Sequence, residues 1–351
     1  MTEEWSDIKR GTPRHESFPA TLRHSAIPSF PEHKLLASWV FCLLMVAGEG
    51  SAFGQFQNAT PTGELFGETA TQRWQIGFIC SAPAGTCRNI VATQTVPMDW
   101  PEQKVTIAGQ DVSPGVDVDY RDVGDSARQM VVKVPQLPAG AEVRAVITFE
   151  TRRAYLLEPK NPEQFTLPSR TRVPASLRRY LSPSPLIESN SRTIRDLATK
   201  IAPQGGPAWN RVEAVYDWVR TNVQFVDNQG QEPVDTLTTL QRKHGDCDEM
   251  SCLFIALCRA SGIPARLVQV PGHVYAEFYL LDDKNEGRWL PCQLAGTRAF
   301  GHMPEHRPVM QKGDNLSSPQ TGREKFLILP QRATAASGAP TVEIIGPKPE
   351  P

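Results

Sequence analysis

Three side chains in the second half of the chain could together carry out covalent chemistry on an amide. Cys247 lies in the segment HGDCDEM, immediately before an apolar run, and His273 begins the alternating segment HVYAEFYLL. A thiolate is the attacking species of cysteine enzymes, and an imidazole can take up the thiol proton near neutral pH. Gln293 follows the segment WLPC, and its amide oxygen could orient that imidazole. These residue types predict nucleophilic catalysis by a Cys–His–Gln constellation.

The segment around Cys247 has the pattern of a buried helix. Gly245 and Asp246 can begin it and cap it, and Gly262 and Pro264 end it. Between them the residues are apolar on nearly every face, which is typical of a central helix. Cys247 falls in the first turn, where the free N–H groups favour a thiolate. The acidic neighbours oppose this effect and raise the pKa of the thiol, so that a basic partner is required.

A hairpin is predicted to bring that partner into place. Alternation puts His273 on one strand face with Tyr275, Glu277 and Tyr279, and residues 282–287 read as a turn. If Leu280 pairs with Arg288 of the returning strand, His273 faces about residue 295 and Gln293 is its diagonal neighbour.

These segments resemble a known family. HGDCDEMSCLFIALCRASGIPAR, followed by HVYAEFYL and WLPCQ, is similar to the core of the transglutaminase-like family of papain-like cysteine enzymes, over about residues 180–300. The resemblance implies that Cys247 is the nucleophile and His273 the base. It also implies acyl transfer from an amide through a thioester, and an α+β fold in which helices pack on an antiparallel sheet.

The sequence departs from that family at two positions. Tyr275 stands where the family usually has tryptophan, and Gln293 stands where it usually has aspartate. An amide oxygen can orient an imidazole, but it cannot stabilise an imidazolium as an anion does. We therefore expect a less ionised Cys247–His273 pair than an aspartate would support.

Composition divides the rest of the chain. Short strands separated by Pro, Gly and Asp turns predict that a small Ig-like β-sandwich precedes the papain-like core. Ser191 and Pro207 predict the starts of two core helices. The expected organisation is a linker at 53–70, the β-sandwich at 71–158, a proline-rich connector at 159–189, the catalytic domain at 190–330 and a flexible tail at 331–351.

Residues 1–52 are predicted to form an N-terminal extension with a signal peptide. An apolar run covers residues 35–47, and Gly50-Ser51-Ala52 suits cleavage before Phe53. This predicts export to the periplasm or beyond. The alternatives are a retained membrane anchor formed by residues 35–47 and a buried helix.

Seven cysteines occur in the sequence, one of them, Cys42, in the predicted leader. Cys80 and Cys87 flank a Pro-Gly turn, which predicts a disulfide in an exported protein; two buried free thiols are the alternative. The other four have spacings that match no zinc pattern, and we expect no metal and no cofactor.

The formal net charge of −1 gives no reason to expect nucleic acid as a partner, and a membrane is expected only if residues 35–47 are retained. The sequence leaves the oligomeric state open.

Two functions follow. The first is an exported cysteine acyltransferase, protease or amidase whose partner is a peptide or protein, with cell-wall peptide among the candidates. The second is an inactive transglutaminase-like module that binds such a partner. A chance thiol in a structural protein is a third reading, which the specific Cys247–Arg266 block disfavours.

Overall fold

The structure is a computed structural model, and it describes residues 65–169, 173–202, 205–228, 230–319 and 322–350. The predicted leader, residues 1–52, and its cleavage site lie outside these residues. All the elements below belong to one compact unit, Phe56–Pro351. Among the described residues, no helix has both the length and the apolar character needed to cross a membrane.

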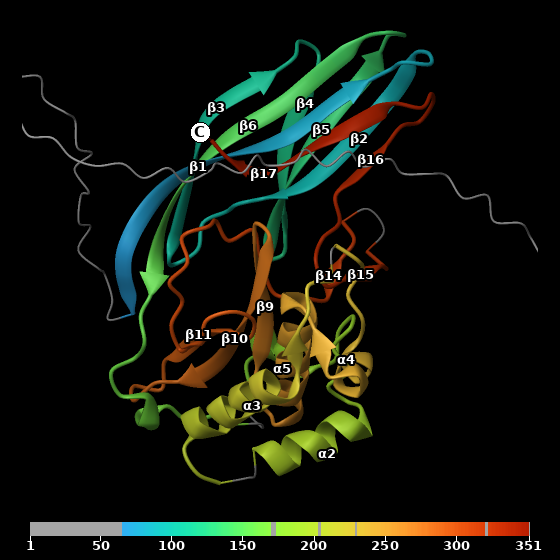
Figure 1. Cartoon of the computed structure of the whole chain (residues 1–351). Helices are drawn as coiled ribbons and strands as arrows, with labels where there is room; N and C mark the ends of the chain where they lie inside the picture. Colours follow the sequence, from blue (N-terminus) through green and yellow to red (C-terminus); the bar gives the residue numbers. More distant parts are fainter. Residues whose placement is uncertain (1–64, 170–172, 203–204, 229, 320–321, 351) are drawn as a thin grey trace, which may run out of the picture. The chain divides into compact units, whose positions relative to one another are not determined.

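The region for which strands are predicted forms six long antiparallel strands (Figure 1). They are β1 (Phe66–Ser81), β2 (Cys87–Val96), β3 (Gln103–Val112), β4 (Asp117–Val123), β5 (Ala127–Leu137) and β6 (Glu142–Leu156). β1, β6 and β3 belong to a four-stranded sheet, whereas β2, β4 and β5 belong to another. Apolar side chains of both sheets share one core, among them Ile76, Phe78, Ile90, Met130 and Ile147.

The limits predicted for this region differ from those observed. β1 begins at Phe66, inside the predicted linker, and the predicted flexible tail forms β16 (Arg332–Thr334) and β17 (Thr341–Pro349). β16 pairs with β2 and β17 pairs with β1, both at sheet edges. An edge strand tolerates proline because only one of its sides needs ladder hydrogen bonds, so proline-rich composition does not exclude a strand there.

The predicted Cys80–Cys87 disulfide is wrong. Both thiols are free and buried. Cys80 lies opposite Val143 of β6, whereas Cys87 lies opposite Leu137 of β5. A Cys80–Cys87 disulfide would suit a hairpin of β1 and β2, but the turn between these strands carries the chain from one sheet to the other.

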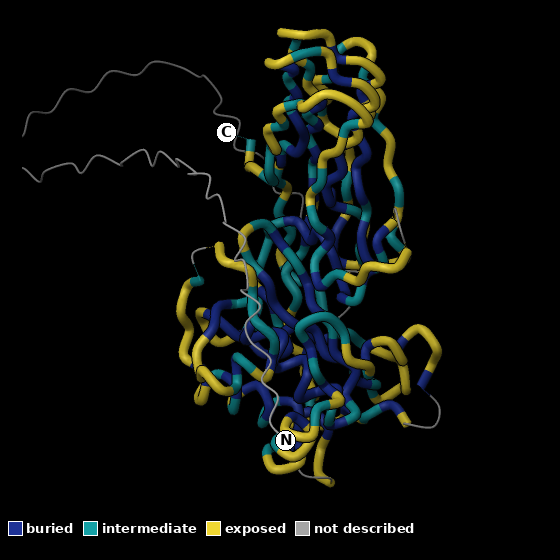
Figure 2. The backbone as a smooth tube through the Cα atoms, turned by 90° about the vertical axis from the view of Figure 1, so that its right-hand side faces the viewer, coloured by how far each residue is buried: buried dark blue, intermediate teal, exposed yellow. Residues whose placement is uncertain are grey.

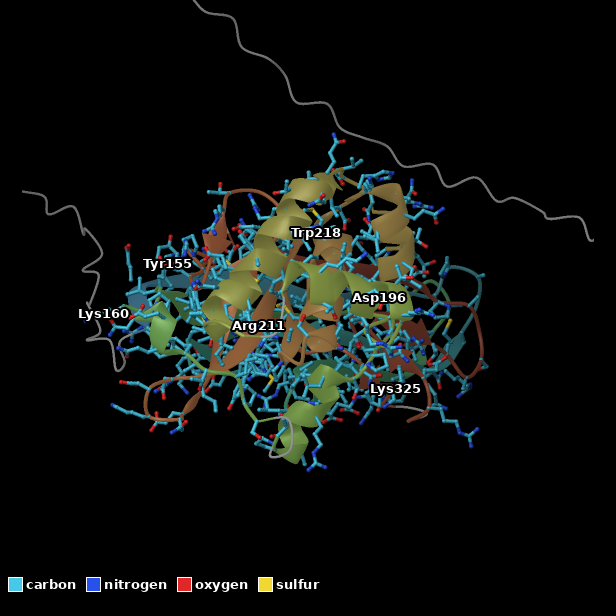
Figure 3. The ribbon with its side chains drawn as sticks, turned by 90° about the horizontal axis from the view of Figure 1, so that it is seen from below. Tyr155, Lys160, Asp196, Arg211, Trp218 and Lys325 are labelled. Carbon is cyan, nitrogen blue, oxygen red and sulfur yellow. The ribbon has the colours of Figure 1, made fainter. Side chains whose placement is uncertain are left out.

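The helices gather around α5 (Cys247–Ala260), as Figure 1 shows. The others are α1 (Ala175–Arg178), α2 (Arg192–Ile201), α3 (Ala208–Asn222) and α4 (Thr236–Arg242), with 3-10 turns η1 (Pro162–Gln164) and η3 (Arg179–Leu181). Ser191 caps α2 and Pro207 precedes α3, as predicted. α5 packs against α2, α3, α4 and the strand His273–Leu281, and its residues from Met250 to Cys258 are buried. The backbone is buried in the interior of the molecule and exposed mainly in its outer loops (Figure 2). Figure 3 labels Arg211 and Trp218 on α3; Arg211 Nη2 donates to Ser261 O at 3.3 Å, which ties α3 to the end of α5.

The strands that carry His273 and Gln293 belong to the same sheet as β2 and β5. The order of this sheet is β12-β11-β10-β9-β13-β5-β2-β16, and β4 pairs with β5. The remaining strands are β7 (Gln224–Phe225), β8 (His244–Gly245), β9 (Ala265–Val270), β10 (His273–Leu281), β11 (Gly287–Gln293), β12 (Ala299–Phe300), β13 (Gln311–Lys312), β14 (Leu316–Ser317) and β15 (Lys325–Phe326). β13 pairs with β9 on one side and with β5 on the other. The predicted sandwich and the predicted core are therefore joined by backbone hydrogen bonds.

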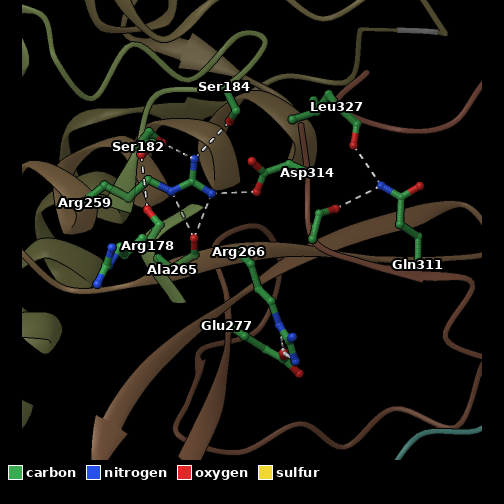
Figure 4. Close-up of polar contacts among 11 residues, drawn as sticks. Arg178, Ser182, Ser184, Arg259, Ala265, Arg266, Glu277, Gln311, Asp314 and Leu327 are labelled. Atoms are coloured by element: carbon green, nitrogen blue, oxygen red, sulfur yellow. Dashed lines mark hydrogen bonds and ion pairs between the residues drawn. The ribbon is translucent and has the colours of Figure 1, made fainter. Parts of the chain in front are cut away.

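Buried ion pairs join β9 to β10 and α5 to the segment that follows β13 (Figure 4). Arg259 Nη2 lies 2.7 Å from Asp314 Oδ2, and Arg266 Nη2 lies 2.6 Å from Glu277 Oε2. Lys312 Nζ also reaches Glu277, at 2.6 Å. Burial alone would raise the pKa of Glu277, but the two cations lower it to about 2. Removing one partner would leave a buried charge uncompensated, so this cluster specifies how the strands align.

Candidate active site

Cys247 is held at the start of α5 by a capping box. The Asp246 carboxylate accepts hydrogen bonds from the N–H groups of Asp248 at 2.8 Å and Glu249 at 3.3 Å, and Glu249 Oε2 accepts one from Asp246 N at 2.8 Å. A Cβ atom at Gly245 would lie 2.8 Å from the Glu249 side chain. The Gly-Asp-Cys sequence is thus explained by local packing: glycine leaves room for the glutamate that completes the cap.

The surroundings of Cys247 favour the protonated thiol. Burial is the main cause, and the carboxylates of Asp248 and Asp246 add to it, so that the pKa of Cys247 rises to about 12. The backbone N–H of Val274 acts in the opposite direction. Cys247 Sγ lies 3.8 Å from Asp248 Oδ2, and burial together with Asp246 raises the pKa of Asp248 to about 6. The site therefore rests as a neutral thiol beside acidic groups.

His273 begins β10 directly after a two-residue turn. Val270 pairs with His273 across Pro271 and Gly272, and Gly272 has a φ of 69°, which favours glycine. Leu280 lies opposite Arg288, the register predicted from the sequence. The predicted alternation also holds: Val274, Ala276, Phe278 and Leu280 join the helical core, and Tyr275 lies in a different cluster.

Gln293 ends β11 and contacts His273. The His273 Nε2 and Gln293 Oε1 atoms are 3.1 Å apart, and Gln293 Nε2 donates to Thr297 O at 3.1 Å. The second bond directs the amide oxygen toward the imidazole. Since this oxygen can only accept, His273 Nε2 carries the proton and Nδ1 is left as the basic nitrogen.

Two residues of α3 hold the backbone at Gln293. Tyr216 Oη donates to Gln293 O at 2.9 Å, and Arg220 Nη1 donates to Leu294 O at 2.8 Å. Arg220 Nη2 also donates to Gly296 O at 2.8 Å. The sequence gives no indication of the role of Arg220, because a single arginine on an amphipathic helix carries no signal of what it contacts. Trp289 of β11 does not take part in these contacts: the Arg266 guanidinium lies over its ring, with Cζ 4.0 Å from the ring centroid.

A cavity of about 880 Å³ is lined by Cys247, His273 and Gln293 together. Its further lining includes Phe225, Asp227, Gln269, Arg307 and Ile328. Burial lowers the pKa of His273, and the positive charge of Arg307 lowers it further, whereas Gln293, Glu305 and Asp246 act to raise it. Burial and neighbouring charges therefore favour the neutral forms of both Cys247 and His273, whereas the hydrogen bond to Gln293 favours the imidazolium.

One group of potential metal ligands in the described part of the chain coincides with this site. The ligand atoms of Asp246, Cys247 and Asp248 lie within 4.8 Å of one another. Asp246 already accepts two backbone hydrogen bonds as the cap of α5. Asp246 Oδ1 is therefore engaged in capping α5, and we assign no metal to the group.

Comparison with protein families identifies the segment that carries these residues. Residues 195–294 match the transglutaminase-like superfamily. The resemblance predicted from the sequence is thereby confirmed over the segment that includes Cys247, His273 and Gln293.

Two further similarities were found. The crystal structure of a candidate cysteine protease from Cytophaga hutchinsonii superimposes with a TM-score of 0.50 at 17% identity, over 79% of this chain and 93% of that one. This likeness shows that the two chains share a fold. An uncharacterized protein of Haemophilus influenzae is 24% identical over 129 residues, which are 36% of this chain and 34% of the relative. The chain thus matches only about a third of that relative's length.

Proposed function

We propose that the chain is a cysteine-dependent amide hydrolase or acyltransferase that acts on peptide or protein amides. The observation that carries this proposal is the His273–Gln293 pair, whose oriented imidazole lines the same cavity as Cys247. Its Nε2 is engaged by Gln293, so its Nδ1 is free to act as the base. The match of residues 195–294 to the transglutaminase-like superfamily supports the same roles.

The reaction would begin with attack of Cys247 Sγ on the carbonyl carbon of the amide. The thiol proton passes to His273 Nδ1, and the carbonyl oxygen takes up the negative charge. The backbone N–H of Cys247, at the free end of α5, can donate to this oxygen. The imidazolium then returns the proton to the departing amine, and a thioester remains on Cys247. Water or an amine attacks this thioester, which regenerates the thiol and releases an acid or a new amide.

The neutral resting state affects how the first step proceeds. Because the pKa of Cys247 is raised to about 12 and that of His273 is lowered, a standing thiolate–imidazolium pair is disfavoured. Proton transfer therefore accompanies the attack, with Gln293 fixing the ring without adding charge.

The substrate would be a peptide or protein that the exported chain meets outside the cytoplasm, with cell-wall peptides among the candidates. Export follows from the predicted leader at residues 1–52 and its cleavage before Phe53. Sequencing the N terminus of the protein isolated from its native host tests this part, and an intact Met1 terminus on a cytosolic species would contradict it.

Activity is tested with an electrophilic amide probe and a panel of fluorogenic peptide amides. We expect the probe to label Cys247, and Cys247→Ala to abolish both labelling and turnover. Cys252→Ser is the matched control, because Cys252 lies buried in the body of the same helix. Labelling of another cysteine first, or turnover retained by Cys247→Ala, would refute the proposal. A folded wild type that neither reacts nor turns over would indicate the inactive binding module.

A further inference from the structure

The strand that carries His273 is contacted by an arginine from the other sheet. Arg153 lies on β6 of the four-stranded sheet, and its side chain is fully buried at 0% exposure. Its Nη2 donates to Tyr275 Oη at 2.9 Å, and its Nη1 donates to the carbonyl oxygen of Arg307. Tyr275 is also fully buried. One guanidinium thus joins β6 to β10 and to the segment that precedes β13.

Arg307 continues this connection to the other side of His273. Its Nη1 donates to Pro271 O at 2.8 Å, and its Nε donates to Glu305 Oε2 at 2.9 Å. Pro271 precedes the histidine by two residues, and Tyr275 follows it by two. The contacts that begin at Arg153 therefore reach the chain on both sides of His273.

The chemistry of position 275 fits this arrangement. A guanidinium has only donors, and the indole N–H of tryptophan is also only a donor. A phenol oxygen can accept, so tyrosine satisfies a buried arginine that tryptophan could not. The departure from the family's usual tryptophan at position 275 is explained by the presence of Arg153.

We propose that Arg153 is a positioning residue for the reaction: through Tyr275 and Arg307 it holds residues 271–275 so that His273 meets Gln293 and serves Cys247. This inference rests on the proposed function, because it assigns His273 a reaction to serve. Under this proposal β6 contributes to the reaction, although it lies outside residues 195–294, which match the transglutaminase-like superfamily.

Kinetics of the full chain test the proposal with Arg153→Met, Tyr275→Phe and the double variant. We expect Arg153→Met to lower kcat about 10- to 100-fold with KM little changed, since a small displacement of a catalytic group costs this much. The double variant should be no worse than Arg153→Met, because both changes break the same contact. Arg152→Met is the control, since Arg152 is the exposed neighbour on β6.

A second measurement does not depend on activity. The His273 imidazole is titrated by NMR in the full chain carrying Cys247→Ala, with and without Arg153→Met. The charged groups that act on His273 are Arg307, Glu305 and Asp246. Loss of the bond from Arg153 to the Arg307 carbonyl should displace Arg307 and the Glu305 that pairs with it, so the pKa of His273 should change and its resonance should broaden. If the proposed function is wrong, the wild type will show no turnover, but Arg153→Met will still change the titration of His273.

Two outcomes would overturn the positioning role. One is a folded Arg153→Met variant whose kcat and His273 titration match those of the wild type. If Arg153→Met does not fold, Tyr275→Phe decides, because it keeps the buried ring and removes only the acceptor. Unchanged kcat and an unchanged His273 titration in Tyr275→Phe would then overturn the proposal.

Discussion

Replacing Asp248 by asparagine should make Cys247 more reactive and the protein more stable at neutral pH. Asp248 Oδ2 lies 3.8 Å from Cys247 Sγ, and its negative charge is one of the causes that raise the pKa of the thiol. Its own pKa is raised to about 6, so at neutral pH it is held ionised in a place that disfavours its charge. The substitution Asp248→Asn keeps the size of the side chain and removes the charge.

The magnitude follows from the distance. Two unit charges about 4 Å apart at an effective dielectric constant of about 20 repel by roughly 4 kcal/mol. Half-buried groups in an open cavity retain about half of this, which corresponds to about a 30-fold change in thiolate fraction. The thiolate of a thiol with a lower pKa is also a weaker nucleophile, which reduces its rate of attack about fivefold. We expect alkylation of Cys247 to become about five- to tenfold faster near neutral pH.

The stability change has a definite sign. The pKa of Asp248 is about 6 in the folded protein and near 3.8 when unperturbed. The folded state therefore binds this proton more tightly, and stability falls as pH rises from about 4 to about 6 and stays lower above that range. The full linkage would be about 3 kcal/mol, and we expect about 1–2 kcal/mol after discounting for solvent. Asp248→Asn should recover this at pH 7 and not at pH 4.

The assay is iodoacetamide labelling of Cys247 followed by mass spectrometry across the pH range, with urea unfolding at pH 4 and pH 7. The other described cysteines are buried, so labelling of the native protein reports on Cys247. Asp196→Asn is the control, because it removes an exposed carboxylate on α2. Alkylation profiles of Asp248→Asn and wild type that superimpose, with no gain in stability at pH 7, would refute the reasoning.

Three other predictions concern the site and the sheets. Gln293→Ala should lower turnover about 10- to 100-fold by freeing the imidazole, and Gln293→Asp should shift the pH profile of Cys247 alkylation to lower pH; profiles unchanged from wild type would place Gln293 outside the constellation. Arg220→Met should lower kcat by about tenfold while leaving the midpoint of thermal unfolding within a few degrees, because it frees the backbone after Gln293; a normal kcat would contradict this. Cys80 and Cys87 should both alkylate in denatured protein without a reductant, and a mass two daltons lower for an unlabelled peptide pair would show that they are linked.

Local pattern was enough to predict the parts of the site that depend on one element. The cap at Asp246, the first-turn position of Cys247 and the pairing of Leu280 with Arg288 follow from spacing within a single helix or hairpin. Arg153 and Arg307 could not be predicted, because their contacts join segments far apart in the sequence. Cys80 shows the same limit: its strand was identified, but which strand pairs with it depends on sheet topology.

The pairing of β17 with β1 affects how this protein can assemble. β1 begins at Phe66 and β17 begins at Thr341, so almost all of the folded chain lies between two strands that pair with each other. Pairs so distant in sequence form late and slowly, because a long loop must close before any contact compensates for the lost entropy. Until then β1 exposes a long unpaired edge that can recruit another chain. Loss of residues 341–349 should therefore appear first as aggregation of the nascent or refolding protein, with little direct effect on the geometry around Cys247.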